Sequence, residues 1–121
     1  MRGDIFLFHW NDDEARAYAH PLQAAGWKVV WEAADGGRGA ALVAAKPPDL
    51  VVIYLSRLPS HSREVARTLR EQKATKHIPV VFVDGDAEAI AKVRGVAPDA
   101  AFITNDQLVS YAEKFTHKKT T

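Results

Sequence analysis

Acidic residues gather near the N-terminus, where Asp12, Asp13 and Glu14 follow the apolar run 5–10. Carboxylates are the ligands that hard cations such as Mg²⁺ prefer, so one interpretation of this cluster is a cation site. The other interpretation is local, because Asn11 and Glu14 have the spacing of a helix N-cap with a capping box. Acids in a first helical turn also face the positive end of the helix dipole. We favour the capped helix, which explains the acids without a cation.

Other metal and nucleophile chemistry has little support in the sequence. The chain contains no cysteine, which excludes disulfide frameworks, thiolate nucleophiles and cysteine-ligated zinc. No glycine-rich phosphate loop follows the first apolar run, and this disfavours a nucleotide or flavin. We therefore expect neither a metal nor another cofactor. Four histidines lie on expected helices or loops without the spacing of a ligand set, namely His20, His61, His77 and His117.

Length and charge describe an ordinary single domain. The 121 residues carry 16 basic and 15 acidic side chains, a formal net charge of +1. This balance gives no general attraction to nucleic acid or anionic lipid, so neither is an expected partner. No apolar run approaches the length of a membrane span, and the N-terminus lacks the layout of a signal peptide. The expected location is the cytoplasm.

Apolar runs alternate with helical patterns along the chain. Leu50 to Leu55 is apolar without interruption, which is typical of a central strand covered on both faces. Ser60 or Ser62 is expected to cap the third helix. The expected strands are 5–10, 27–32, 50–55, 78–83 and 100–103, and the expected helices are 12–25, 38–45, 62–73, 87–93 and 106–115.

This alternation predicts a doubly wound α/β fold. Five strands and five helices fit a parallel five-stranded sheet in three α/β/α layers, with right-handed crossovers. The flavodoxin-like strand order 2-1-3-4-5 is the expected one, and it places a crevice at the carboxyl ends of the first and third strands. We expect one domain over residues 1–115 and a disordered basic tail over 116–121.

Four segments resemble response regulator receiver domains. Residues 48–53, followed by Leu58 and Pro59, are similar to the third strand and the loop after it. Residues 77–82 are similar to the fourth strand, residues 24–29 to the end of the first helix and the second strand, and residues 34–36 to the turn after that strand. Their order and spacing cover nearly the whole chain. The resemblance implies the fold of these domains and, with it, a role in two-component signal transduction or phosphorelay.

The same resemblance identifies five positions that carry the chemistry of the family. The pair of acids that holds Mg²⁺ after the first strand falls on His9 and Trp10. The aspartate that accepts the phosphoryl group falls on Tyr54, which is the phosphoacceptor-equivalent position. The serine or threonine after the fourth strand falls on Asp84, and the lysine after the fifth strand falls on Asn105. All five residue types therefore differ from those of the family.

A slipped register would make Asp12 and Asp13 the acid pair. That register shortens the first helix before Gly26, and it leaves Tyr54 in place of the aspartate. Tyrosine cannot form an acyl phosphate, and its phenol is a poor nucleophile at neutral pH without a base. The resemblance thus implies a degenerate receiver, or pseudo-receiver, that is not an enzyme and acts as a phosphorylation-independent protein-interaction module.

Two interpretations of the substituted pocket remain open. In one, aromatic side chains plug the crevice and satisfy each other's hydrogen bonds. In the other, His9, Tyr54, Asp84 and Asn105 form a rebuilt crevice of a ligand sensor or small enzyme, with an Asp84–His9 pair for acid–base chemistry.

The expected partners are a histidine kinase, an output protein or a second copy. The resemblance implies that they would bind the surface formed by the fourth helix, the fifth strand and the fifth helix.

Overall fold

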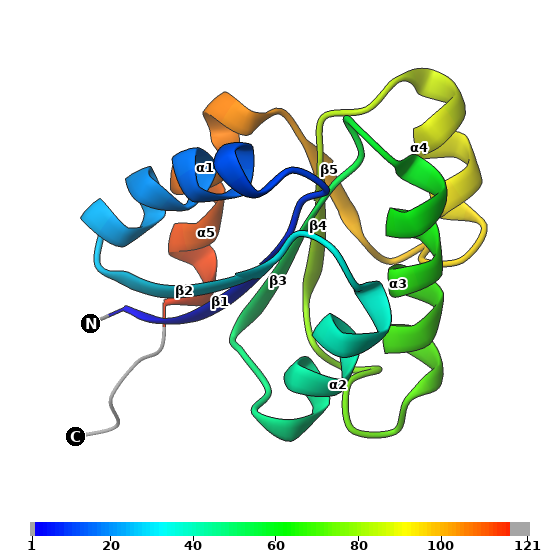
Figure 1. The fold of residues 1–121 in the computed structure, drawn as a ribbon, viewed down its shortest axis with the longest axis horizontal. Coiled ribbons are helices and arrows are strands. Elements are labelled where there is room, and N and C mark those ends of the chain that lie inside the picture. Colours follow the sequence, from blue (N-terminus) through cyan, green and yellow to red (C-terminus); the bar gives the residue numbers. More distant parts are fainter. Residues whose placement is uncertain (1, 117–121) are drawn as a thin grey trace.

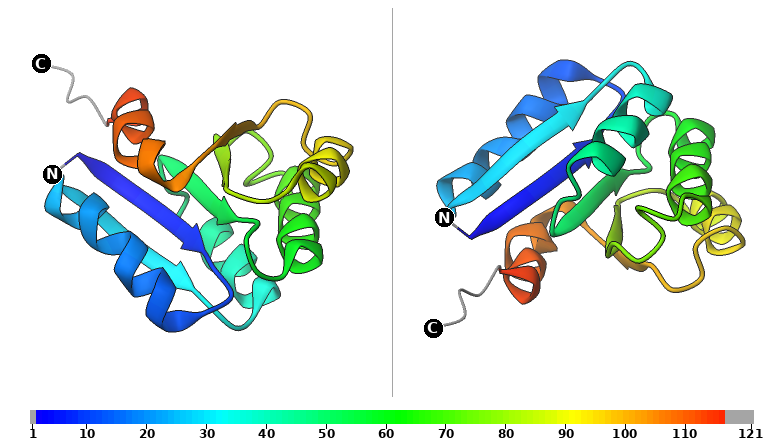
Figure 2. Two further views of the ribbon diagram at one scale, coloured as in Figure 1. Left: turned by 90° about the horizontal axis from the view of Figure 1, so that it is seen from above. Right: turned by 90° about the horizontal axis from the view of Figure 1, so that it is seen from below.

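A parallel five-stranded sheet forms the centre of the molecule (Figure 1). The computed structural model describes residues 2–116. The strand order β2-β1-β3-β4-β5 confirms the predicted topology. Figure 2 shows β1, β2 and β3 running in the same direction. The strands are β1 Gly3–Phe8, β2 Trp27–Glu32, β3 Leu50–Tyr54, β4 Val80–Val83 and β5 Ala101–Ile103.

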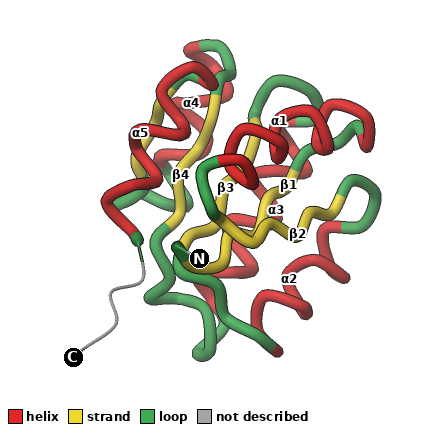
Figure 3. The backbone as a smooth tube through the Cα atoms, turned by 90° about the vertical axis from the view of Figure 1, so that its left-hand side faces the viewer, coloured by secondary structure: helices red, strands yellow, loops and turns green. Residues whose placement is uncertain are grey.

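Helices cover both faces of this sheet and complete the predicted three layers. Helices α1 and α5 lie on one face, and α2, α3 and α4 lie on the other (Figures 1 and 3). The expected last helix is shorter than predicted, because short 3₁₀ turns precede and follow it. The helices are α1 Asp12–Ala24, α2 Gly36–Ala45, α3 Pro59–Glu71, α4 Ala87–Arg94 and α5 Leu108–Ala112, with turns η1 Asn105–Gln107 and η2 Glu113–Phe115.

Two hydrophobic cores result from the alternation of side chains along each strand. Phe6 and Phe8 of β1 pack toward α2 and α3, whereas Ile5 and Leu7 pack toward α1. All five residues of β3 are buried, as the uninterrupted apolar run predicted. Tyr54, the last residue of β3, belongs to the core on the side of α1 and α5. This side of the sheet therefore contains the predicted phosphoacceptor-equivalent position.

Three helices start at a side-chain cap, and each of these caps lies shortly after the end of the preceding strand. The Asn11 Oδ1 atom accepts a hydrogen bond from the Glu14 backbone N–H at 3.0 Å, which confirms the predicted N-cap of α1. Asp35 caps α2 and Asp86 caps α4 in the same way. Such caps satisfy backbone donors that a helix leaves free at its start. They also fix where the first turn of each helix lies over the sheet edge.

The predicted serine cap of α3 is wrong. Helix α3 begins at Pro59 after Leu58, without a side-chain cap. Proline suits a first turn because its φ angle is already helical and the missing N–H would have had no helical partner. Ser62 is instead fully buried, and its hydroxyl donates to the Tyr54 carbonyl oxygen at 2.6 Å. This serine joins α3 to the end of β3.

The ends of the described chain meet beside the first and fifth helices. Arg2 donates to the Ala25 carbonyl oxygen at 2.6 Å and pairs with Glu113 in η2. The expected tail lies outside the described residues except for Thr116, which donates to the Glu113 carbonyl oxygen at 3.0 Å. Within residues 2–116, no helix combines the length and apolar character needed to cross a membrane.

Candidate functional site

The carboxyl edge of the sheet brings together four of the five predicted site residues. Tyr54 ends β3 opposite Val83 of β4, and His9 and Asp84 each directly follow a strand. The Tyr54 hydroxyl donates to Asn105 Oδ1 at 2.5 Å, and the Asn105 backbone N–H donates to Asp84 Oδ1 at 3.1 Å. Because parallel strands end at the same edge, residues distant in sequence become neighbours there.

Tyr54 fills the position beneath this edge. Its side chain is 1% exposed and stacks on Tyr18 of α1, with ring centroids 4.9 Å apart and planes inclined by 12°. Burial, and then the nearby charge of Asp84, raise the pKa of the Tyr54 hydroxyl above its ordinary value. The phenol is therefore neutral and acts as a hydrogen-bond donor. A neutral, buried phenol is a poor nucleophile.

His9 lies beside Tyr54 and is fully buried. Its ring centroid is 4.8 Å from that of Tyr54 and 5.3 Å from that of Tyr18. The Nε2 atom approaches Glu14 Oε1 at 3.2 Å, but neither ring nitrogen makes an aligned hydrogen bond to a residue in the described chain. Burial lowers the pKa of His9, and this effect exceeds the opposite influence of Glu14. The imidazole is therefore neutral at neutral pH.

The carboxylate beside His9 is not the predicted one. The hypothesis of an Asp84–His9 pair needs correction, because His9 pairs with Glu14 and Asp84 accepts the Asn105 backbone N–H. The cap at Asn11 places Glu14 in the first turn of α1, above the end of β1. Asp84 adopts φ = 60°, in the left-handed region that aspartate tolerates better than most residues.

Trp10 contacts the core on the face of the sheet opposite to that of Tyr54, although it lines the same depression as Asp84. Its indole N–H donates to Ser62 Oγ at 2.8 Å, and its ring lies 5.6 Å from that of His61 on α3. Trp10 packs against the core on the opposite face of the sheet, next to Phe8. It therefore forms a wall between the edge and α3. Neither Trp10 nor His9 carries the negative charge that a hard cation requires.

Three residues that contact the predicted site were not among the predicted site residues, namely Glu14, Tyr18 and Arg57. Glu14 was interpreted as part of a cap or of a cation site and not as a partner of His9, and Tyr18 lies one turn further along the same helix and shares its face. Arg57 donates to Glu14 Oε2 through Nε at 3.1 Å and also through Nη2. This hydrogen bond lowers the pKa of Glu14 and raises that of Arg57. The sequence contains no local signal for Arg57, because its partner lies 43 residues away.

An open depression of about 560 Å³ lies over the aromatic cluster. Tyr54 and His9 do not line it, because the rings of the cluster fill the space below. The contacts between the rings agree with the plug interpretation, whereas of the four residues of the predicted rebuilt crevice only Asp84 lines the depression. Its lining residues are Trp10, Glu14, Tyr18, Ser56, Arg57, Leu58 and Asp84.

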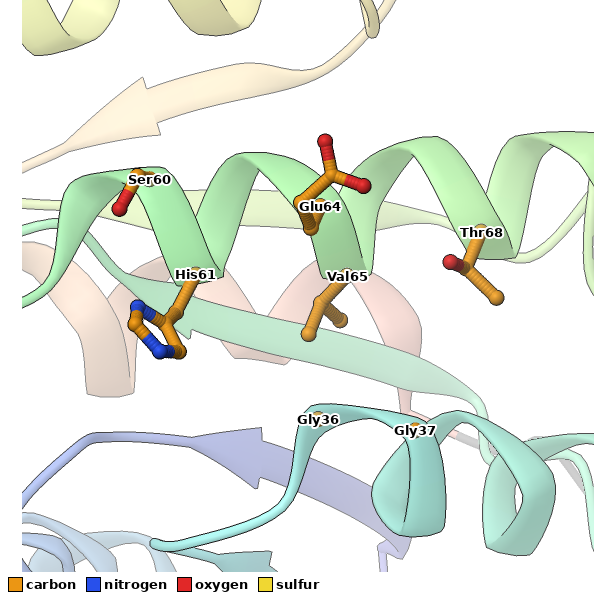
Figure 4. A pocket seen from close by; sticks show the side chains of 7 residues that line it. All are labelled: Gly36, Gly37, Ser60, His61, Glu64, Val65 and Thr68. Atoms are coloured by element: carbon orange, nitrogen blue, oxygen red, sulfur yellow. The ribbon is translucent and has the colours of Figure 1, made fainter.

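A second cavity of about 300 Å³ lies between α2 and α3. Figure 4 shows His61 and Val65 directed from α3 toward Gly36 and Gly37 at the start of α2. A side chain at Gly36 would place its Cβ atom 2.7 Å from Val65, so glycine permits the close approach of the two helices. None of the predicted site residues lines this cavity.

The acidic turn of α1 is engaged in local contacts. Asp12 accepts the Trp31 indole N–H at 3.1 Å and pairs with Arg16 at 3.3 Å. Among residues 2–116, no group of three or more histidine, cysteine or acidic side chains is arranged to hold a metal ion. The interpretation of these acids as a capped helical turn agrees with the Asn11 cap.

Several solved structures that superpose on this chain are response regulators or receiver domains. The chemotaxis protein CheY4 of Vibrio cholerae superposes with a TM-score of 0.77 at 16% identity, over 95% of this chain and 99% of that one. The signal receiver domain of a histidine kinase from Syntrophus aciditrophicus gives 0.74 at 19% identity, over 98% of each chain. A LuxR-family two-component response regulator from Aurantimonas sp. gives 0.75 at 21% identity, over 94% of this chain and 84% of that one.

The chain therefore has the fold of response regulator receiver domains over nearly its whole length. No protein-family model matches the sequence. No curated protein matches it either. At these identities the similarity defines the fold, and the activity must be argued from the site.

Proposed function

We propose that this protein is a degenerate receiver domain that acts in cytoplasmic two-component signalling as a phosphorylation-independent interaction module. The observation that carries the proposal is the buried Tyr54 at the end of the central strand, hydrogen-bonded to Asn105 and stacked on Tyr18. The receiver fold of the solved neighbours suggests the signalling context. The module would not be an enzyme, because its proposed phosphoacceptor position holds a phenol.

The charges at the edge support this proposal. A carboxylate nucleophile that approaches an anionic phosphoryl donor needs a cation and a lysine to offset the charge. Here Glu14 is neutralised by Arg57, and the buried His9 is neutral. Asn105 occupies the proposed lysine position and accepts the Tyr54 hydroxyl. The site is thus organised as a hydrogen-bonded plug.

The surface of α4, β5 and α5 is the proposed contact area for a histidine kinase, an output protein or a second copy. Phe102 is half-buried, stacks on Phe82 with centroids 5.4 Å apart, and lies 4.7 Å below the Arg94 guanidinium. Lys114 lies 4.8 Å from the ring of Tyr111. Aromatic rings accompanied by cations are frequent in protein interfaces, where both contribute to binding.

A phosphorylation assay tests the proposal directly. The full chain is incubated with acetyl phosphate and Mg²⁺, and its intact mass is measured beside a receiver domain that retains the acidic pocket. We expect no added phosphoryl group on this chain. Magnesium titration followed by amide NMR is expected to leave the resonances of His9, Tyr54 and Asn105 unchanged, because Glu14 is paired with Arg57 and Asp84 accepts the Asn105 backbone N–H.

Two results would contradict the proposal. One is a phosphorylated species that persists in the variant Tyr54→Phe and maps to an acidic residue at this edge. The other is saturable magnesium binding at millimolar concentration that shifts the Asp84 resonances.

The open depression favours a ligand sensor as the second candidate function. Trp10 and Tyr18 supply aromatic walls, and Asp84 supplies a carboxylate with one oxygen bonded to Asn105. A small organic cation suits such a lining. Titration with arginine amide as a probe, followed by amide NMR, tests this candidate. Shifts confined to these lining residues would support it, and Asp84→Asn would remove them.

A further inference from the structure

We propose that His9, Glu14 and Arg57 form a proton-sensitive latch, in which protonation of His9 strengthens its contact with Glu14 and releases Arg57 from this carboxylate. The latch would make partner binding by the interaction module depend on pH. Only this effect on a partner rests on the proposed function. The chemistry of the latch is a property of these three side chains. It uses the edge at which receiver domains respond to phosphorylation, but the proposed input is a proton.

The geometry places one carboxylate between two basic groups. Glu14 Oε2 accepts two N–H donors of Arg57, one of them at 3.1 Å. The other oxygen, Oε1, lies 3.2 Å from His9 Nε2. Glu14 thus connects the end of β1 with the loop between β3 and α3. A change of charge on His9 must alter how this carboxylate is shared.

The neutral ring is poorly provided with hydrogen bonds. Neither nitrogen of His9 has an aligned partner in residues 2–116, although the side chain is fully buried. The groups that face it are Glu14 and Tyr18 from α1, Tyr54 from β3, Arg57 from the next loop and Asp84 after β4. Glu14 and Asp84 favour the protonated ring, whereas burial and Arg57 oppose it. The pKa of the His9 imidazole therefore depends on the charges of Glu14, Arg57 and Asp84.

Exposure decides which cation leaves the carboxylate after protonation. The side chain of His9 is 0% exposed, whereas that of Arg57 is 47% exposed. An uncompensated buried charge is costly, but an exposed guanidinium is readily hydrated. The imidazolium therefore needs Glu14 more than Arg57 does. Arg57 then moves into solvent, and Glu14, whose Oε1 atom already lies 3.2 Å from His9 Nε2, stays with the imidazolium.

Release of Arg57 changes the surface over the depression. Arg57 and the neighbouring Leu58 line its rim, and Leu58 is 46% exposed. Both belong to the short loop that leads into α3 at Pro59. Freed from α1, this loop presents a basic and an apolar side chain in a new arrangement. A partner that contacts this loop would bind differently at low and neutral pH.

An NMR titration of the full chain tests the latch. The imidazole resonances of His9 and the Nε–Hε resonance of Arg57 are followed from pH 8 downward. We expect both to change with the same midpoint, below the ordinary histidine value of 6.5. The Arg57 resonance should move toward the position of a hydrated arginine.

Matched variants separate the latch from general acid effects. Glu14→Gln should lower the His9 midpoint, whereas Arg57→Gln should raise it, because these neighbours act on His9 in opposite directions. His9→Phe keeps a ring in the cluster and should abolish the Arg57 transition. His61→Asn is the control, since His61 is exposed on the other side of Trp10 and should leave both midpoints unchanged.

Two outcomes would overturn the latch. Arg57 could remain bound to Glu14 while His9 titrates, or the Arg57 transition could persist in His9→Phe. If His9→Phe does not fold, the unmodified chain still tests the latch. Equal midpoints of the His9 and Arg57 resonances support it, and different midpoints contradict it. A phosphorylated species would contradict the proposed function and leave these titrations unaffected, so the two failures are distinguishable.

Discussion

The Tyr54 hydroxyl donates a hydrogen bond to Asn105 Oδ1 at 2.5 Å, across 51 residues of sequence. This bond joins the end of the central strand to the start of the last helical segment. It also occupies the two side chains that stand at the proposed phosphoacceptor and lysine positions. Its removal should therefore be measurable in the stability of the domain.

Tyr54→Phe is expected to lower the free energy of unfolding by about 1 kcal/mol, because it leaves Asn105 Oδ1 without its donor. Urea denaturation monitored by circular dichroism measures the change. Tyr111→Phe is the control, since Tyr111 is only half-buried and its ring contacts do not involve the hydroxyl. Equal effects of the two variants would show that the Tyr54 hydroxyl contributes nothing.

Ser62→Ala is expected to destabilise the domain by about 2 kcal/mol, because the Trp10 indole N–H and the Tyr54 carbonyl oxygen both lose a partner. Ser60→Ala, two residues earlier on the exposed side of α3, should change stability by less than about 0.5 kcal/mol. Thermal unfolding of the two variants compares these effects. A neutral Ser62→Ala would mean that the buried hydroxyl is dispensable.

Gly39→Ala tests the contact of α2 with β1. The added Cβ atom would overlap the ring of Phe8, and we expect a loss of about 1–3 kcal/mol. Gly37→Ala is the matched control in the same helix, because its Cβ atom would be 3.4 Å from Asp35 Oδ1 and would meet no ring. Helix propensity then predicts a neutral or slightly stabilising effect. Urea denaturation midpoints distinguish the two positions.

The pH dependence of stability follows from His9. Its pKa is lowered in the folded state by burial, so the unfolded chain binds more protons between that pKa and the ordinary value of 6.5. The free energy of unfolding therefore rises with pH over this interval and does not change further above it on account of His9. Urea denaturation at a series of pH values measures the slope. His9→Phe should lack this contribution, and an unchanged slope would exclude His9 as its source.

Local patterns were sufficient to predict the fold. The uninterrupted apolar run of β3 predicted a strand buried on both faces, and all five of its residues are buried. The spacing of Asn11 and Glu14 predicted the start of α1 correctly. These features depend on neighbours in sequence and on the periodicity of side chains, which the sequence displays directly. The prediction for Ser62 was wrong, because its hydroxyl bonds to the carbonyl oxygen of Tyr54 in β3, and a serine near a helix start resembles a cap when only its sequence neighbours are known.

The sequence by itself determined the type of each side chain at the strand ends, and therefore the phenol of Tyr54 and the imidazole of His9. Only the tertiary structure decided which groups they meet: Asn105 for the phenol, and Glu14 with its partner Arg57 for the imidazole. The physical reason is that hydrogen bonds and ion pairs act over a few ångströms of space. The parallel sheet brings these distant loops to one edge, and no spacing along the chain records that proximity.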